Sequence, residues 1–126
     1  MKDIKKYFTL PASPEEVYQA LTYPATLQLW TGARAEMSTI PGSEFSLWDG
    51  DIVGKNLEFI PHQKIVQQWY FEGQDAISIV TIKLHPHKSG CSVELRHVNI
   101  PDEAYEEMLQ GWVEMYFGAL EDFYAS

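Results

Sequence analysis

Residues 91 to 124, CSVELRHVNIPDEAYEEMLQGWVEMYFGALEDFY, change their hydrophobic period at Pro101, and this change decides the fold. Before Pro101, polar and apolar residues alternate, so that one face of an extended chain carries Cys91, Val93, Leu95 and His97. This alternation predicts a strand with one buried face. After Pro101, apolar residues recur at intervals of three and four, at Tyr105, Met108, Leu109, Trp112, Tyr116, Leu120 and Phe123. The spacing predicts one long amphipathic helix to Tyr124, which at about 1.5 Å per residue can lie across a small sheet.

The alternating pattern extends upstream over residues 33 to 100, where short runs are separated by turn residues. Turns are predicted at Pro41-Gly42-Ser43, Asp49-Gly50, Pro61-His62, Glu72-Gly73-Gln74-Asp75 and Lys88-Ser89-Gly90. Runs joined by such turns predict an antiparallel meander. In one run, the face expected to be buried carries Ile65, Gln67, Trp69 and Phe71.

The N-terminal part predicts an extended start over residues 5 to 10 and then two short helices. Ser13 stands where a hydroxyl can cap a helix, and Pro14 occupies the first helical position. This helix should run through Leu21 and end near Tyr23-Pro24, with a second helix from Ala25 to Trp30. The elements together predict an α+β fold, in which a curved antiparallel sheet of six or seven strands wraps around the long C-terminal helix.

Composition and charge narrow the classes of protein that this chain can belong to. The 126 residues are 45% hydrophobic, which predicts a single domain over 1–126 with a packed core. The net charge is -9, and residues 102 to 126 hold seven acidic groups and no basic one. This surface disfavours nucleic acid and anionic membranes as partners. No apolar run approaches the roughly 18 residues of a membrane helix, and the lone Cys91 fits a reducing compartment, so we expect a cytoplasmic protein.

Several short motifs follow one another along nearly the whole chain: Ser13-Pro14-Glu15-Glu16-Val17-Tyr18, Trp30, Pro41-Gly42-Ser43-Glu44-Phe45, Asp49-Gly50-Asp51-Ile52-Val53-Gly54, Trp69, Ile100-Pro101, Gly111-Trp112 and Tyr116-Phe117. In this order they resemble the helix-grip (START-like, SRPBCC) superfamily. Within it, the chain is most similar to the C-terminal domain of the activator of the ninety-kilodalton heat-shock chaperone ATPase and to its single-domain bacterial relatives.

The resemblance implies a non-catalytic binding protein, with a heat-shock chaperone as its partner. The eukaryotic activator has an additional N-terminal domain that grips the chaperone, and 126 residues leave no room for it. ATPase activation is therefore not carried over by the resemblance. The alternative is a carrier or sensor of a small apolar ligand, since many helix-grip proteins hold such ligands between sheet and helix. Some relatives are cyclases or isomerases, but the sequence shows no acid and base pair that would support an enzyme.

A set of large apolar side chains is expected to gather between the sheet and the C-terminal helix. Such a set can line a ligand cavity, because aromatic rings hold open a concave space and Met adapts to varied shapes. It can equally form an ordinary core, and the sequence leaves both interpretations open. The candidate ligand-binding residues are Trp30, Phe45, Trp69, Leu95, Met108, Trp112, Met115 and Tyr116. Among them, Trp112 lies in the middle of the apolar face of the predicted helix and is predicted to anchor the helix on the sheet.

The predicted helix also carries an acidic face and two glycines. Candidate partner-binding residues on the acidic face are Glu103, Glu106, Glu107 and Glu114, although a solvated face would look the same. Gly111 and Gly118 each cost about 1 kcal/mol relative to alanine inside a helix. Close approach to a strand would explain them, and so would a need to keep cavity volume free or to bend the helix.

The remaining reactive residue types do not predict a metal, cofactor or catalytic site. His85 and His87 are expected to be an exposed pair, because no carboxylate lies at a recognisable ligand spacing. His97 ends the buried face of its strand and is expected to be a hydrogen-bonded core histidine. Cys91 lacks a cationic neighbour and is expected to be a small buried side chain. No glycine-rich phosphate loop is present, so we expect no nucleotide cofactor.

Overall fold

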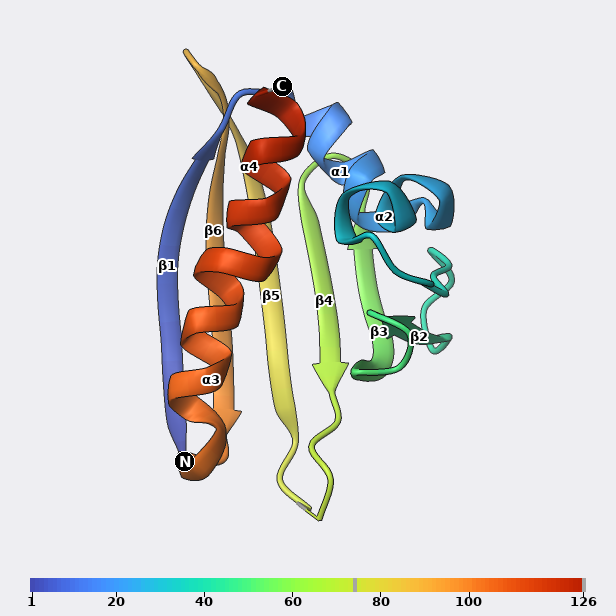
Figure 1. The fold of residues 1–126 in the computed structure, drawn as a ribbon, viewed down its shortest axis with the longest axis vertical. Coiled ribbons are helices and arrows are strands. Elements are labelled where there is room, and N and C mark those ends of the chain that lie inside the picture. The colour runs from blue at the N-terminus through green and yellow to red at the C-terminus, as the bar shows by residue number, and fades with distance from the viewer. Residues whose placement is uncertain (74, 126) are drawn as a thin grey trace.

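The computed structural model describes residues 1–73 and 75–125 and contains one antiparallel sheet in the order β1-β6-β5-β4-β3-β2. The strands are β1 (Lys2–Leu10), β2 (Glu44–Leu47), β3 (Ile52–Ile60), β4 (Lys64–Trp69), β5 (Ser78–His87) and β6 (Gly90–Ile100). The six strands confirm the predicted meander (Figure 1). Of the turn predicted at 72–75, Gln74 lies outside the described residues.

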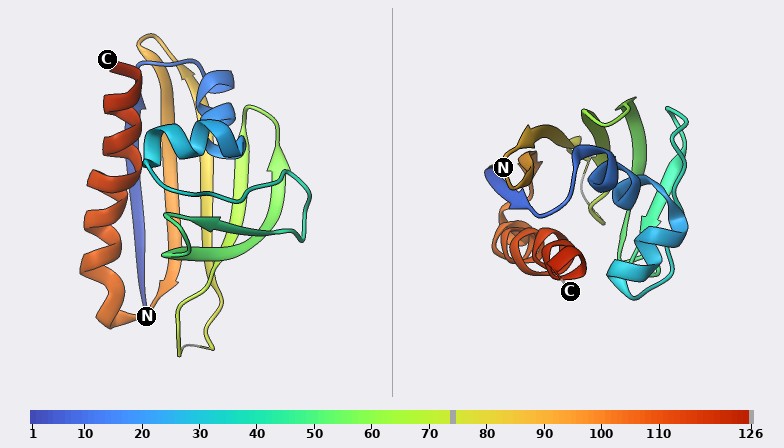
Figure 2. Two further views of the ribbon diagram at one scale, coloured as in Figure 1. Left: turned by 45° about the vertical axis from the view of Figure 1, so that its right-hand side comes forward. Right: turned by 90° about the horizontal axis from the view of Figure 1, so that it is seen from above.

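The C-terminal helix lies along the inner face of this sheet, which curves around it (Figure 2). It is built from a 3-10 turn η1 (Asp102–Ala104), α3 (Tyr105–Gln110), a π-helical turn η2 (Gly111–Tyr116) and α4 (Phe117–Ala125). The predicted α+β fold is therefore confirmed, and the arrangement is the one that the helix-grip resemblance implies. No helix in the described ranges is both long and apolar enough to cross a membrane.

Two short helices, α1 (Pro14–Thr22) and α2 (Pro24–Thr31), close one end of the curved sheet (Figure 2). The helix cap predicted at Ser13 is present, and it is part of a capping box: Ser13 Oγ accepts the Glu16 N–H at 3.2 Å, and Glu16 Oε1 accepts the Ser13 N–H at 3.2 Å. Trp30 Nε1 donates to the Ala20 carbonyl oxygen at 2.8 Å, which joins the two helices.

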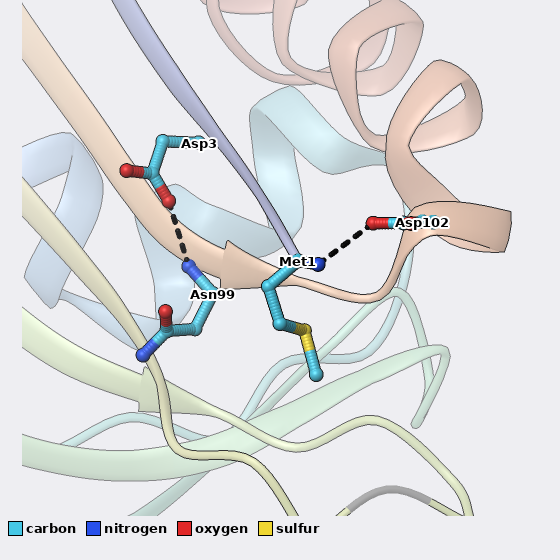
Figure 3. Close-up of polar contacts among 4 residues, drawn as sticks. All are labelled: Met1, Asp3, Asn99 and Asp102. Atoms are coloured by element: carbon cyan, nitrogen blue, oxygen red, sulfur yellow. Dashed lines mark hydrogen bonds and ion pairs between the residues drawn. The ribbon is translucent and has the colours of Figure 1, made fainter.

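The passage from β6 into the C-terminal helix is fixed by the first residues of the chain (Figure 3). The β1–β6 register shifts between Lys2 and Ile4, and the Asp3 carboxylate in this bulge accepts the backbone N–H of Asn99 at 3.0 Å. The terminal amine of Met1 lies 2.9 Å from the Asp102 carboxylate, and this contact lowers the pKa of Asp102. Both contacts link the first residues of the chain to the end of β6 and the start of the helix.

The middle of the helix differs from the uninterrupted α-helix that the sequence predicts. In η2 the Phe117 N–H donates to the Trp112 carbonyl oxygen, five residues back, so the turn holds more residues than an α-turn. A Cβ on Gly118 would overlap the Val113 carbonyl oxygen, whereas a Cβ on Gly111 would meet no atom within 4 Å. Close approach to a strand therefore explains neither glycine: Gly118 permits the wide turn, and Gly111 faces open space.

The two glycines should respond in opposite directions to the same substitution. Gly111→Ala should raise the free energy of unfolding by up to about 1 kcal/mol, because it adds helix propensity without a clash. Gly118→Ala should lower it by about 1–3 kcal/mol, because the methyl group must displace the Val113 carbonyl. Urea denaturation of both variants measures the difference. Equal stabilisation by both substitutions would show that the helix has no wide turn.

Candidate functional site

A pocket lies where η2 faces the β2–β3 turn and the end of β4. It has a volume of about 50 Å³, several times the space that one water molecule requires. We call it the aromatic pocket, and its lining residues are Trp48, Ile52, Trp69, Met108, Gly111, Trp112 and Tyr116. Figure 2 shows that the turn joining β2 to β3 projects toward the middle of the helix. The pocket therefore occupies the gripping space between sheet and helix.

A larger concavity of about 620 Å³ continues outward from the aromatic pocket. The two share Trp48, Ile52, Met108 and Gly111, so they form one funnel that opens to solvent. We call the wider part the outer hollow. The residues found only in its wall are Asp51, Glu107, Gln110, Glu114 and Met115. The funnel thus changes from an aromatic interior to an acidic rim.

Trp112 forms the floor of the aromatic pocket and is 2% exposed. Its ring stacks on Trp69 with centroids 4.7 Å apart, and its Nε1 donates to His97 Nδ1 at 3.0 Å. An indole nitrogen can only donate, so His97 Nδ1 must accept and Nε2 must carry the proton. Nε2 lies 2.9 Å from Ser78 Oγ, which donates to the Val98 carbonyl oxygen at 2.9 Å. His97 is the hydrogen-bonded core histidine that the sequence predicts.

Trp69 is held by a second chain of buried polar groups. Its Nε1 donates to Gln67 Oε1 at 3.0 Å, and Gln67 Nε2 donates to Asn56 Oδ1 at 2.9 Å. Asn56 Nδ2 then donates to the Ser38 carbonyl oxygen at 3.1 Å, which ties strands β3 and β4 to the loop before β2. Because every member has a partner, this network fixes the ring orientation of Trp69.

The mouth of the funnel is held in an uncommon backbone conformation. Trp48 and Asp49 have φ angles of 51° and 53°, in the left-handed region that costs roughly 1–2 kcal/mol for a residue other than glycine. The Asp49 N–H donates to the Arg34 carbonyl oxygen at 2.9 Å, which helps to hold the turn. This conformation places the partly exposed Trp48 ring edge-on to Trp30, with centroids 6.0 Å apart. Strained residues of this kind cluster at functional sites.

Tyr116 lies at the inner end of the pocket, against Trp112 and Trp30 at ring-centroid distances of 4.6 and 5.1 Å. The residue is only 4% exposed, and burial raises its pKa. Its hydroxyl has no hydrogen-bond partner among the described residues. The hydroxyl oxygen is not completely buried, because no completely buried side-chain oxygen or nitrogen among these residues lacks a partner. The hydroxyl is therefore partly accessible, and Tyr116 lines the aromatic pocket.

The structure brings together only part of the predicted ligand-binding set. Trp69, Met108, Trp112 and Tyr116 line the aromatic pocket. Behind this lining, Trp30 packs on Tyr116, Phe45 packs on Trp69 at 6.4 Å between centroids, and Leu95 is fully buried. Trp48 and Ile52 also line the pocket but were not among the predicted residues. Ile52 belongs to the motif at residues 49–54 and Trp48 directly precedes it, but their approach to the helix depends on the strained turn, which no local pattern predicts.

Met115 does not face the sheet as the α-helical spacing predicted. Its side chain is 58% exposed and contributes only to the outer hollow. The π-helical turn explains this difference. Because a π-turn holds more residues than an α-turn, Met115 lies further from the face of Trp112 than α-helical geometry would place it, and Tyr116 lies above Trp112. Of the predicted acidic residues, Glu107 and Glu114 line the outer hollow, and Glu103 and Glu106 are exposed outside it.

The lining of the aromatic pocket contains no carboxylate or imidazole that could act as a general acid or base; the carboxylates of the funnel lie in the outer hollow. Both ring nitrogens of His97 are engaged, and its ring lies beneath Trp112 and outside the pocket lining. The His85 and His87 pair is exposed, as predicted, and the described residues contain no group of three or more metal-ligating side chains. Cys91 is buried, and burial raises the pKa of its thiol. The arrangement is therefore suited to binding.

Comparison with known proteins agrees with the resemblance drawn from the motifs. The sequence profile described as "Activator of Hsp90 ATPase homolog 1-like protein" matches residues 11–124. An uncharacterized protein of Schizosaccharomyces pombe is 28% identical over 91% of this chain, and the mouse activator of 90 kDa heat shock protein ATPase homolog 2 is 23% identical over 82%. The chain spans about a third of these two relatives, 34% and 32% of their lengths.

Solved structures support the same relationship. The crystal structure of PFC0360w, an HSP90 activator from Plasmodium falciparum, superposes with a TM-score of 0.83 at 26% identity and covers 97% of this chain and 94% of that one. The solution structure of the Aha1 dimer from Colwellia psychrerythraea, at 20% identity, has the same fold with a TM-score of 0.83 and covers 98% and 96% of the two chains.

Substitutions at Trp112 should separate its packing from its hydrogen bond. Trp112→Ala should lower the free energy of unfolding by about 3–5 kcal/mol, because the ring is fully buried. Trp112→Phe keeps most of the packing but leaves His97 Nδ1 without a donor, which should cost about 1–3 kcal/mol. Val113→Ala, at an exposed neighbour, should change stability by only a few tenths of a kcal/mol. A near-neutral Trp112→Ala in urea denaturation would contradict the assigned orientation of the helix.

His97 should make the protein less stable in mild acid. Burial lowers the pKa of His97 to about 4 from its usual 6.5, with Asp3 acting weakly in the opposite direction. The unfolded chain therefore takes up a proton near pH 6.5 that the folded protein accepts only near pH 4. The stabilisation from neutral His97 is complete above pH 6.5 and should fall by about 3 kcal/mol as the pH drops to 4.

This pH dependence is measured by urea denaturation between pH 7 and 4.5. His97→Gln can still accept from Trp112 but does not titrate, so its free energy of unfolding should change less with pH than that of the wild type. His87→Gln, at an exposed position, should retain the wild-type slope. An unchanged slope in His97→Gln would mean that His97 does not titrate in a shifted range.

Proposed function

The chain belongs to the family of activator of Hsp90 ATPase homolog 1-like proteins, and we propose that it is a non-catalytic binding protein that holds a small apolar group in the aromatic pocket. The observation that carries this proposal is the open space beside Gly111. Protein interiors are close-packed, so an open aromatic space in the grip of a small domain calls for an occupant.

The composition of the helix supports this interpretation. Gly111 lines the aromatic pocket, a Cβ at this position would meet no atom within 4 Å, and alanine there would favour the helix by about 1 kcal/mol. Glycine forgoes that stabilisation and keeps the space free. The fixed orientations of Trp69 and Trp112 mean that little side-chain entropy is lost when a ligand binds.

Binding is favoured over catalysis by the chemistry of the lining. Within the aromatic pocket, the one ionisable group of the lining is the Tyr116 hydroxyl, and its raised pKa keeps it protonated at neutral pH. A protonated phenol can orient a ligand through a hydrogen bond, but it is a poor base. The site therefore offers shape, aromatic surface and one polar contact.

A second candidate function is an interaction with a heat-shock chaperone. It is supported by the family and by the names of two relatives, the mouse ATPase activator homolog and the Plasmodium falciparum HSP90 activator. The exposed carboxylates of Glu103, Glu106, Glu107 and Glu114 provide an acidic surface on the helix. Such a surface would steer a basic patch on the partner, and salt would screen the attraction.

The neutral fluorophore N-phenyl-1-naphthylamine tests the proposed pocket. Its binding should quench native tryptophan emission, because Trp48, Trp69 and Trp112 line the aromatic pocket. Gly111→Leu should abolish the quenching by filling the pocket, while Val113→Leu on the exposed side of the same turn should not. Native mass spectrometry of freshly purified protein would reveal a ligand that co-purifies. Absence both of probe binding to the wild type and of a co-purifying ligand would remove the ligand proposal and leave the chaperone interaction as the candidate.

A further inference from the structure

We propose that the aromatic pocket and the outer hollow form one site for a small amphipathic cation, which places the edge of an apolar ring in the aromatic pocket and an amine at the rim of the outer hollow. This inference rests on the proposed function and specifies the class of ligand. The ligand would extend from the Tyr116 hydroxyl at the inner end to the carboxylates at the mouth. Three independent features of the funnel support it.

The first feature is the charge of the rim. The outer hollow carries the carboxylates of Asp51, Glu107 and Glu114, and its lining contains no Lys, Arg or His. In the described part of the chain, none of these carboxylates is ion-paired; Glu114 accepts a hydrogen bond from Gln110 Nε2 at 3.3 Å. A cation entering the hollow would find three negative groups without competing partners, whereas an anion would be repelled.

The second feature is the Tyr116 hydroxyl. It belongs to a side chain that is 4% exposed and lines the aromatic pocket, and it has no protein partner among the described residues. Because the hydroxyl is not fully enclosed, it is free to bond to a ligand atom or a water molecule. A polar atom on the inner end of the ligand would satisfy this hydroxyl.

The third feature is the position of Trp48 between these two regions. Trp48 lines both the aromatic pocket and the outer hollow, next to Asp51 of the same turn. The face of an indole attracts cations through its quadrupole, by about 0.5–2 kcal/mol depending on exposure. The left-handed backbone at Trp48 and Asp49 holds the ring at the mouth. An amine there would contact an aromatic face and carboxylates together.

Four probes with one common ring test the charge requirement. Phenethylamine is a cation, 2-phenylethanol is neutral, 3-phenylpropanoate is an anion, and tyramine adds a para-hydroxyl to phenethylamine. Dissociation constants are measured from the tryptophan indole N–H resonances in ¹H–¹⁵N spectra. Phenethylamine should bind about tenfold more tightly than 2-phenylethanol, and 3-phenylpropanoate should bind more weakly than both. Added salt should reduce the advantage of the cation.

Variants that remove charge test whether the rim carboxylates bind the cation. The double variant Glu107→Gln/Glu114→Gln should lower the affinity for phenethylamine about three- to tenfold and leave that for 2-phenylethanol unchanged. The matched control, Glu121→Gln/Asp122→Asn, makes the same change in net charge at exposed positions of α4 that do not line the funnel. The control should retain the preference for the cation. Equal losses in both double variants would contradict a local effect of the rim.

The proposed contact between the Tyr116 hydroxyl and the ligand is tested by comparing the affinities for tyramine and phenethylamine. In the wild type, tyramine should bind about threefold or more tightly than phenethylamine, because its para-hydroxyl meets Tyr116. In Tyr116→Phe this difference should vanish, while the free energy of unfolding stays within about 0.5 kcal/mol because the protein loses no internal hydrogen bond. A tyramine advantage that persists in Tyr116→Phe would overturn the proposed orientation.

The two proposals fail in distinguishable ways. If 2-phenylethanol and N-phenyl-1-naphthylamine bind but phenethylamine shows no advantage, the cation site is wrong and the apolar pocket stands. If no probe shifts a tryptophan resonance at millimolar concentration and no ligand co-purifies, both proposals are wrong. If phenethylamine binds equally well to Gly111→Leu, the cation is held elsewhere on this acidic protein and the funnel is not its site.

Discussion

The hydrogen bond from the Trp112 indole to His97 is the contact on which the rest of the gripping space depends. A buried indole N–H requires an acceptor, and the neutral imidazole of His97 supplies one at 3.0 Å from inside the sheet. This bond fixes the rotation of the helix, the tautomer of His97 and the plane against which Trp69 stacks. Ser78 completes the chain on the far side, so no member of this group is left unsatisfied.

The π-helical turn follows from the same constraint. With Trp112 held over His97, the wide turn places Tyr116 above it and directs Met115 toward solvent. Gly118 allows the turn to close against the Val113 carbonyl, and Gly111 leaves the space beside Trp112 open. The position of the pocket along the helix is therefore set by where the helix departs from α-geometry. Departures of this kind are frequent at functional sites.

The fold could be predicted from the sequence because its signals are local. The alternation at residues 91–97, the capping box at Ser13 and the three-and-four spacing after Pro101 each report the immediate backbone geometry. The site was only partly predictable because it depends on distant contacts. Gln67 alternates with Ile65 and Trp69 on the face expected to be buried, which indicated a buried polar group. Its hydrogen bond to Asn56, however, forms only when β3 and β4 pair. Nothing local indicated the left-handed Trp48 or the unpartnered Tyr116 hydroxyl.

The open space at Gly111 also places stability and the proposed binding function in opposition at one position. Because most larger residues are better helix formers than glycine, selection for thermal resistance alone would replace Gly111 and gradually close the pocket. The same applies in the laboratory: a screen that rewards only heat tolerance would recover substitutions at this position among its gains. A thermostable variant obtained in that way could keep the whole fold and yet have lost the open space in which we propose that a ligand binds.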